Sequence, residues 1–173
     1  LMVIPGELGQ LLDRMLDHFG IYPTRRAAVK RAAQEAWLRD NASVSWIPGA
    51  HGLLRGLRSL GHELVLMTNS TEPGWRSAAK RLGLRGELDR FLLSWELGFA
   101  KPDPRMWELV ESRYPEVPRE NFWMVGDRDG DDLAVPKERG WNVVLVDGEA
   151  SLHELHRRLV GNGLILIADV PVE

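Results

Sequence analysis

The sequence predicts an α/β fold in which a doubly wound, Rossmann-like parallel sheet follows a short pair of helices. Two observations lead to this prediction. From about residue 47 onward, nearly continuous apolar runs alternate with amphipathic helical segments. This is the pattern of parallel strands that are buried on both faces and connected by helices. Before residue 47, the spacing of the apolar residues indicates helices alone.

The first 46 residues contain the pair of helices. Between residues 7 and 18, leucine and methionine recur at intervals of three and four, as on one face of a helix. A second helix is predicted over residues 24–40, because Pro23 stops the first segment and the following threonine is a favourable N-cap.

A third amphipathic helix is predicted over residues 50–60, and Gly61 is the glycine that typically follows the end of a helix.

Strands and helices then alternate to the end of the chain. The run at residues 63–67 is almost entirely apolar, which indicates a strand buried on both faces. Further strands are predicted over residues 90–95, 122–125, 142–146 and 164–167. Helices are predicted over residues 74–82, 103–113, 133–139 and 151–160.

Composition narrows the possible functions. The chain has 173 residues, 22 Lys and Arg against 25 Asp and Glu, a net charge of −3, and no cysteine. It therefore offers one domain-sized core and no disulfide, thiolate nucleophile or zinc-ribbon ligand. No apolar run reaches the roughly 18 residues of a membrane span, and the charge balance gives no basic face for nucleic acid. We expect a cytoplasmic protein without a membrane or nucleic-acid partner; the oligomeric state stays open.

Polar residues follow two of the predicted strands. Thr68, Asn69 and Ser70 come after the 63–67 run, and residues 126–132, Gly-Asp-Arg-Asp-Gly-Asp-Asp, come after the 122–125 run. Ligands of such sheets bind beyond the carboxyl ends of the strands. Hydroxyl and backbone N–H groups at a helix N-terminus suit phosphate, and clustered aspartates suit Mg²⁺. The sequence therefore predicts an anion site and a cation site at one edge.

A lysine lies between these two stretches, on the proline-stiffened loop of residues 98–104. The Lys101 ammonium can neutralise phosphate oxygens or pair with a carboxylate cluster. Each of the three features also has an ordinary structural explanation when it is taken singly. Residues 68–70 would be a helix cap, Lys101 a surface lysine and residues 126–132 an acidic turn. Their occurrence in this order, each after a predicted strand, favours a functional site.

These motifs resemble those of a known family. Thr68-Asn69, Lys101-Pro102-Asp103 and Gly126-Asp127 with Asp131-Asp132 are similar, in this order, to the second, third and fourth motifs of the haloacid dehalogenase-like (HAD) hydrolases. The resemblance extends from about residue 47 to residue 147. It implies a helical cap over residues 1–46 and a Rossmann-like core over residues 47–173. Supporting matches are Pro48-Gly49, Ser94 and Gly140.

The resemblance also implies roles for the motif residues. Thr68 and Asn69 would bind phosphate, with Thr68 hydrogen-bonded to the transferring phosphoryl group. Lys101 would bind phosphate as well and would balance charge during catalysis. Mg²⁺ would be the cofactor, and its site is expected at Asp127, Asp131 and Asp132.

Two departures from the family pattern fall in this last stretch. Asp131 stands where the family usually has an asparagine, and Pro136 stands where a small residue is common. By the resemblance, Asp127 helps to hold the metal, while Asp132 positions the lysine and the metal's surroundings. The departures are expected to shift metal affinity without breaking the pattern.

The family's first motif is an Asp-x-Asp after the first strand, in which one aspartate attacks phosphorus. Residues 1–60 contain no such motif: Asp13 and Asp17 read as surface residues of a helix, and Asp40 follows a helix. We expect the nucleophile upstream of Leu1. The alternative is a permuted arrangement in which residues 164–167 are the first strand and Asp169 is the first-motif aspartate. The position of the acid/base aspartate is then occupied by a proline, which favours an ordinary edge strand for residues 164–167.

The resemblance thus implies a magnesium-dependent phosphatase that acts on a small phosphate ester. Dehalogenation occurs within the family, but the aspartate-rich fourth motif favours phosphate and metal. The alternative function is a catalytically inactive HAD-like domain that binds phosphate or a protein partner. The identity of the substrate is not encoded in these motifs, because specificity depends on side chains that the sequence alone does not place.

Overall fold

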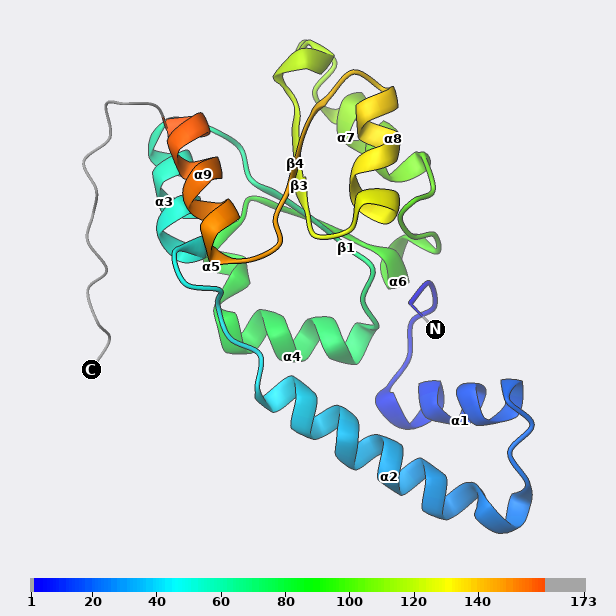
Figure 1. Ribbon diagram of the computed structural model, residues 1–173. Coiled ribbons are helices and arrows are strands. Elements are labelled where there is room, and N and C mark those ends of the chain that lie inside the picture. The colour runs from blue at the N-terminus through cyan, green and yellow to red at the C-terminus, as the bar shows by residue number, and fades with distance from the viewer. Residues whose placement is uncertain (1, 161–173) are drawn as a thin grey trace. The chain divides into compact units, whose positions relative to one another are not determined.

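The computed structural model describes residues 2–160, and helices and strands alternate along most of this range (Figure 1). The strands are β1 (Val65–Thr68), β2 (Arg90–Leu93), β3 (Trp123–Gly126) and β4 (Asn142–Leu145). The helices are α1 (Leu8–His18), α2 (Pro23–Ala42), α3 (Ala50–Ser59), α4 (Glu72–Leu82), α5 (Leu84–Glu87), α6 (Ser94–Leu97), α7 (Arg105–Arg113), α8 (Ala134–Glu138) and α9 (Glu149–Val160). A 3₁₀ turn, η1 (Arg119–Asn121), precedes β3, and a π-helical turn, η2 (Asp129–Leu133), follows it.

The strands pair in two sheets. β1 and β2 are neighbours in one sheet, and β3 and β4 are neighbours in the other. β3 and β4 run parallel, with Trp123 opposite Asn142 and Gly126 opposite Leu145. Parallel neighbours require a crossover connection, which η2 and α8 provide. The alternation of helices with parallel strands confirms the predicted α/β, Rossmann-like fold.

The chain divides into two compact units. The first comprises Leu1–Ser45, Met67–Gly86 and Leu92–Ala100, and the second comprises Trp46–Leu66, Glu87–Phe91 and Lys101–Glu173. The assignment of residues 1–46 to a cap and of residues 47–173 to a core stays a prediction. Among residues 2–160, no helix is both long and apolar enough to cross a bilayer.

In the first unit, α1 and α2 form a helical hairpin. The apolar face of α1 is buried at Leu11, Leu12 and Leu16, as the three- and four-residue spacing predicts. α2 has no fully buried residue and contacts both α1 and α4. Its contact with α1 includes the ion pair in which Lys30 Nζ lies 2.6 Å from Asp13 Oδ2.

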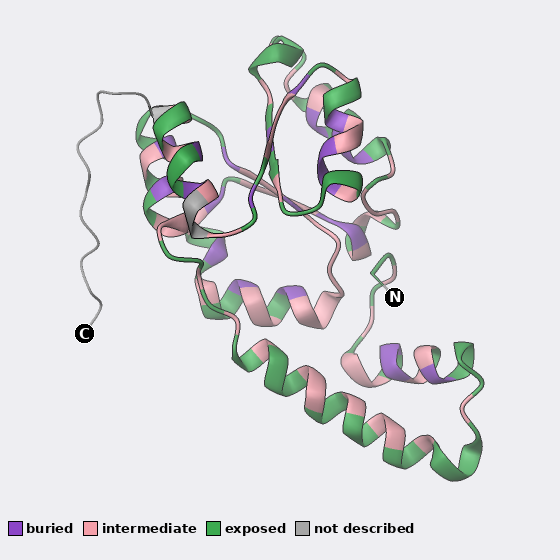
Figure 2. Ribbon diagram, viewed as in Figure 1, coloured by how far each residue is buried: buried purple, intermediate pink, exposed green. Residues whose placement is uncertain are grey.

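The core of the second unit includes residues of α7 and α9. Met106 and Trp107 on this helix are fully buried, and Leu155 on α9 is almost completely buried. Figure 2 shows the buried residues along the inner sides of these helices, while their outer sides are exposed. α3 and α9 pack side by side (Figure 1). The helices predicted over residues 103–113 and 151–160 are therefore amphipathic for the expected reason, because their buried residues belong to this core.

The structure corrects the boundary of one predicted strand. β2 ends at Leu93, whereas the sequence predicts strand through residue 95; Ser94 and Trp95 instead begin α6. This short helix ends at Gly98, whose positive φ of 80° suits glycine. The error arises because the apolar run continues past the end of the strand, and periodicity does not separate short buried helices from strands. The predicted strand 164–167 and Asp169 lie outside the described residues.

Glu111 on α7 joins three segments of the second unit. Its carboxylate accepts hydrogen bonds from Arg139 Nη2 at 2.6 Å, from Trp141 Nε1 at 3.0 Å and from Arg119 Nη2 at 3.0 Å. The hydrogen bond from Arg139 is the main reason that the pKa of Glu111 falls from 4.5 to about 2, against the opposing effect of burial. The ionised carboxylate therefore stabilises the folded state.

We predict that Glu111→Gln lowers the free energy of unfolding at pH 7 by on the order of 2 kcal/mol, allowing for solvent screening at the exposed Arg119. Because folding depresses the pKa, this contribution is fully present above pH 4.5 and is lost as the pH falls toward about 2. Urea denaturation at several pH values measures the difference between the variant and the wild type. The exposed Glu116→Gln is the control; a difference that stays constant down to pH 2 contradicts the prediction.

Candidate functional site

The candidate site in the second unit begins at the carboxyl end of β3. The π-helical turn η2 brings Asp132 back onto Gly126, the last residue of this strand. A Cβ at position 126 would lie 2.4 Å from the Cβ of Asp132, which is far inside van der Waals contact. Position 126 therefore requires glycine, and this requirement explains the glycine that opens the predicted fourth motif.

The carboxylate of Asp132 is buried and accepts three hydrogen bonds. Its Oδ2 accepts from the backbone N–H groups of Asp127 at 3.1 Å and Arg128 at 3.0 Å. Its Oδ1 accepts from Lys101 Nζ at 2.5 Å. The side chains of Lys101 and Asp132 are only 11% and 4% exposed. This is a buried, hydrogen-bonded ion pair that fixes the lysine to the end of β3.

The surroundings of the Asp132 carboxyl shift its pKa in opposite directions. Burial raises the pKa of the Asp132 carboxyl, but the hydrogen bond and charge of Lys101, with the two backbone N–H groups, outweigh it. The pKa of Asp132 consequently lies below its usual value. A carboxylate that accepts this many hydrogen bonds is held in its charged form.

The other aspartates of this stretch differ in their surroundings. Asp127 and Asp129 are exposed, and Asp131 is half-buried with its Oδ2 3.3 Å from Arg128 Nη1. Lys101 and Arg128 face four carboxylates in residues 127–132, so the local charge is negative and favours a cation. Within residues 2–160, no three acidic or histidine side chains are arranged to hold a metal ion.

This arrangement still fits Mg²⁺ bound through few protein ligands. Mg²⁺ keeps several waters and is often bound by one or two carboxylates together with substrate phosphates. The exposed carboxylate of Asp127 is suitably placed at the end of β3. Both oxygens of Asp132, by contrast, already accept hydrogen bonds, which favours a positioning role for this residue.

Thr68 and Asn69 lie in the first unit, at the end of β1 and just after it. The Ser70 hydroxyl is buried and has no hydrogen-bond partner among the described residues. The fully buried Ser94 hydroxyl lies 3.3 Å from the carbonyl oxygen of Ser70 and also within hydrogen-bond distance of the carbonyl of Met2. Buried polar atoms are nearly always paired, so the unpartnered Ser70 hydroxyl is available to a ligand or water.

The structure therefore brings together some of the predicted site residues. Lys101, Asp132 and the backbone of Asp127 form one constellation in the second unit. Thr68 and Asn69 belong to the first unit. The sequence does not identify Arg128, whose backbone N–H donates a hydrogen bond to Asp132. Its position in an aspartate-rich turn is the only feature of the sequence that indicates this role.

Comparison with known proteins identifies the family. Residues 11–138 match the haloacid dehalogenase-like hydrolases, and the chain belongs to this family. The resemblance inferred from the motifs is thus confirmed.

Three individual proteins illustrate the likeness. A phosphoserine phosphatase of Thermus thermophilus is 31% identical over 117 residues, which cover 68% of this chain and 47% of the relative. An (S)-2-haloacid dehalogenase of a Pseudomonas species is 27% identical over 123 residues, covering 68% and 52%. A HAD-family enzyme of Bacteroides thetaiotaomicron, solved with magnesium and inorganic phosphate, shares the fold with a TM-score of 0.61 at 18% identity, over 83% of this chain and 70% of that one. The chain spans about half the length of the curated relatives it matches.

The buried ion pair gives a direct stability prediction. Lys101→Met leaves the Asp132 carboxylate buried without its cation, so we expect the free energy of unfolding to fall by about 3 kcal/mol. Adding Asp132→Asn to this variant removes the uncompensated charge. The double variant should therefore be more stable than the sum of the single effects predicts, by at least about 1 kcal/mol.

Urea denaturation at pH 7 of the wild type, both single variants and the double variant measures this coupling. Lys137→Met, at an exposed lysine on α8, is the matched control and should have little effect. Additive effects of the two substitutions would show that the ion pair contributes no coupling energy.

Proposed function

We propose that the protein is a magnesium-dependent phosphatase that hydrolyses a small phosphate ester. The observation that carries the proposal is the buried Lys101–Asp132 pair at the end of β3, beside the exposed Asp127. Membership of the family and the similarity to a phosphoserine phosphatase support it. The aspartate-rich turn after β3 favours phosphate over a haloacid as substrate, because it offers hard oxygen ligands. The proposal includes the cytoplasmic location that the sequence predicts.

Lys101 is proposed to neutralise the transferring phosphoryl group. Its ammonium is held by Asp132, and Asp132 is in turn held by two backbone N–H groups. A charged group that is already in place costs no reorganisation when negative charge develops in the transition state. Asp132 is therefore a positioning residue for the lysine.

Asp127 is proposed to bind the magnesium ion. The fourth motif also implies Asp131 and Asp132 as residues of the metal site. When bound, Mg²⁺ supplies positive charge next to the phosphate oxygens. Thr68 and Asn69 are proposed to donate hydrogen bonds to the phosphate. The covalent step requires an attacking carboxylate, and none of the residues assigned above has that role.

The proposal is tested by the release of inorganic phosphate from a panel of small phosphate esters, measured on the protein in its full natural length with MgCl₂ or with EDTA. We expect release that depends on Mg²⁺. We predict that Thr68→Ala lowers kcat by about 100-fold, as the loss of one hydrogen-bond donor to a transition state does. Thr68→Ser keeps the hydroxyl and is the matched control.

Failure to release phosphate from any ester, with folded protein and Mg²⁺ present, contradicts the phosphatase proposal. Binding of phosphate without turnover would then favour the alternative, an inactive phosphate-binding domain. The intact mass of the natural polypeptide, compared with the 19.6 kDa of this sequence, shows whether an upstream segment is present.

A second prediction concerns the metal alone. Asp127→Asn should weaken Mg²⁺ binding at least about tenfold, because a contact to a charged group contributes roughly 1.5 kcal/mol or more. Titration calorimetry with MgCl₂ measures this affinity without any substrate. Asp129→Asn removes an exposed carboxylate from the same turn and should have a smaller effect. Unchanged affinity in the Asp127 variant would refute the assignment of this residue.

A further inference from the structure

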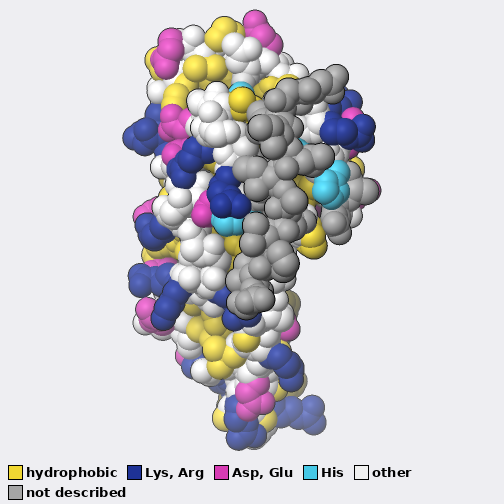
Figure 3. All heavy atoms as spheres, turned by 90° about the vertical axis from the view of Figure 1, so that its left-hand side faces the viewer, with side chains coloured by type: hydrophobic (Ala, Val, Ile, Leu, Met, Phe, Trp, Pro, Cys, Tyr) yellow, Lys and Arg dark blue, Asp and Glu magenta, His cyan; other side chains and the backbone are white. Residues whose placement is uncertain are grey.

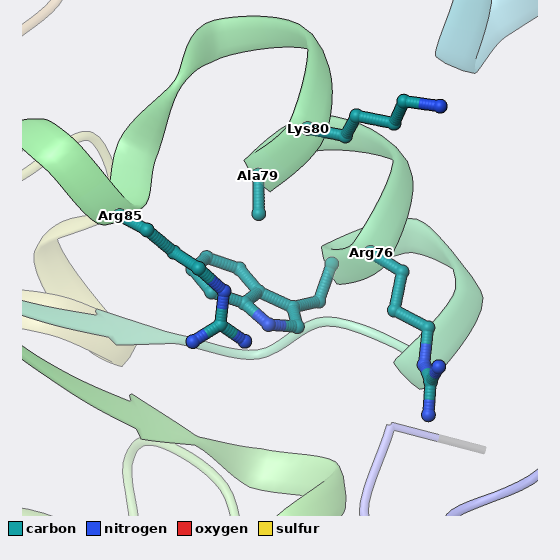
Figure 4. A pocket seen from close by; sticks show the side chains of 5 residues that line it. Arg76, Ala79, Lys80 and Arg85 are labelled. Carbon is teal, nitrogen blue, oxygen red and sulfur yellow. The ribbon is translucent and has the colours of Figure 1, made fainter.

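A cavity in the first unit lies apart from every residue assigned above. It has a volume of about 230 Å³ and is lined by Trp75, Arg76, Ala79, Lys80 and Arg85. Figure 4 shows Arg76, Ala79 and Lys80 on α4 and Arg85 on the segment that follows this helix. None of these residues belongs to the HAD motifs.

The cavity has an apolar floor. Trp75 is 3% exposed and Ala79 is 8% exposed, so these two side chains are part of the unit's core. The Arg85 guanidinium carbon lies 6.0 Å from the centroid of the Trp75 ring, within the range of a cation–π contact. The indole thus holds Arg85 at the rim of the cavity.

The rim is strongly cationic. Between residues 76 and 85 there are four cationic residues and no acidic residue. The acids that flank this stretch are Glu72 and Glu87. Glu72 accepts hydrogen bonds from Arg76 and from the backbone N–H of Gly6, and Glu87 Oε1 lies 2.8 Å from His51 Nε2. These two carboxylates offset only part of the charge of the four cations. Figure 3 shows one face of the molecule, on which cationic and anionic side chains are interspersed over the visible atoms.

We propose that this cavity, between Trp75 and the cations Arg76, Lys80 and Arg85, binds the phosphate group of a small phosphorylated compound. A phosphate monoester carries a charge of about −1.5 to −2 at pH 7. Arginine binds phosphate oxygens through two parallel N–H donors, and lysine binds them as a point charge. The charge of the rim and the charge of the ligand are complementary.

The volume limits the ligand to a small molecule. A water molecule occupies about 30 Å³ of liquid, so the cavity has room for a phosphate with a few carbon atoms. It is smaller than the roughly 300 Å³ at which pockets for drug-sized ligands begin. The apolar floor of Trp75 and Ala79 suits the carbon part of an ester, while the rim suits its phosphate.

The rim side chains must change rotamer to close on one anion. Figure 4 shows Arg76 and Lys80 extending in different directions from α4. All three cations are exposed, and exposed side chains change rotamer within nanoseconds. The site is therefore assembled when the anion binds, so we expect weak but saturable affinity.

The test follows the Nε–H signals of Arg76 and Arg85 by NMR while sodium phosphate replaces sodium chloride at constant ionic strength. EDTA is present, so no magnesium-dependent reaction occurs, and the result is independent of the proposed phosphatase activity. We expect both signals to shift along one saturable curve. Lys80→Gln should weaken this binding about two- to fivefold, as the loss of one exposed charge contact does.

Lys137→Gln, which removes an exposed lysine outside the cavity, is the matched control and should leave the curve unchanged. A second titration with glycerol 2-phosphate separates the two sources of phosphate: tighter binding than inorganic phosphate identifies an ester as the ligand, and equal binding identifies free phosphate. Shifts that do not saturate, or that Lys80→Gln leaves unchanged, would overturn the proposal. Equally large shifts in a titration with sodium chloride alone would also overturn the proposal.

Discussion

The carboxylate of Asp132 connects the parts of the second unit on which the proposed chemistry depends. It lies against Gly126, accepts the backbone N–H groups that follow β3, and pairs with a lysine 31 positions earlier in the sequence. A buried charge is tolerated only when it is paired and hydrogen-bonded. These contacts satisfy that condition together, so the turn η2, the end of β3 and the Lys101 loop are mutually dependent.

The π-helical form of η2 follows from the same constraint. A residue inserted into a helical turn widens it, and such turns are frequent at functional sites. Here the wide turn allows the side chain of Asp132 to point back to the start of its own loop, where it meets the N–H groups of Asp127 and Arg128. A regular helix starting directly after β3 would not present one carboxylate to both N–H groups and to Lys101.

Much of the fold could be predicted from the sequence because burial is periodic. α1, α7 and β4 lie where the apolar pattern places them, since each covers a core on one side or on both. The boundary between β2 and α6 and the turn η2 could not be predicted. Both depend on side-chain contacts that are remote in sequence, such as those of Ser94 with Met2 and Ser70.

The candidate site likewise combines features that the sequence predicts with features that only the structure shows. The motifs predict a function for Lys101 and Asp132, and the structure adds that these residues form a buried pair. The reason for Gly126 lies in the space that Asp132 occupies, which no local pattern reveals. The roles of Thr68, Asn69 and Asp127 stay predictions. The basic cavity on α4 matches no sequence motif, because its residues come from α4 and from the short helix α5 that follows it.

Ser94 places two distant carbonyl groups in competition. Its hydroxyl has one proton, yet it lies within hydrogen-bond distance of both Met2 and Ser70. The proton can be donated to only one of these oxygens at a time. Because Ser94 is fully buried, its hydroxyl joins the residues before α1 and the loop after β1 to the residue that follows β2.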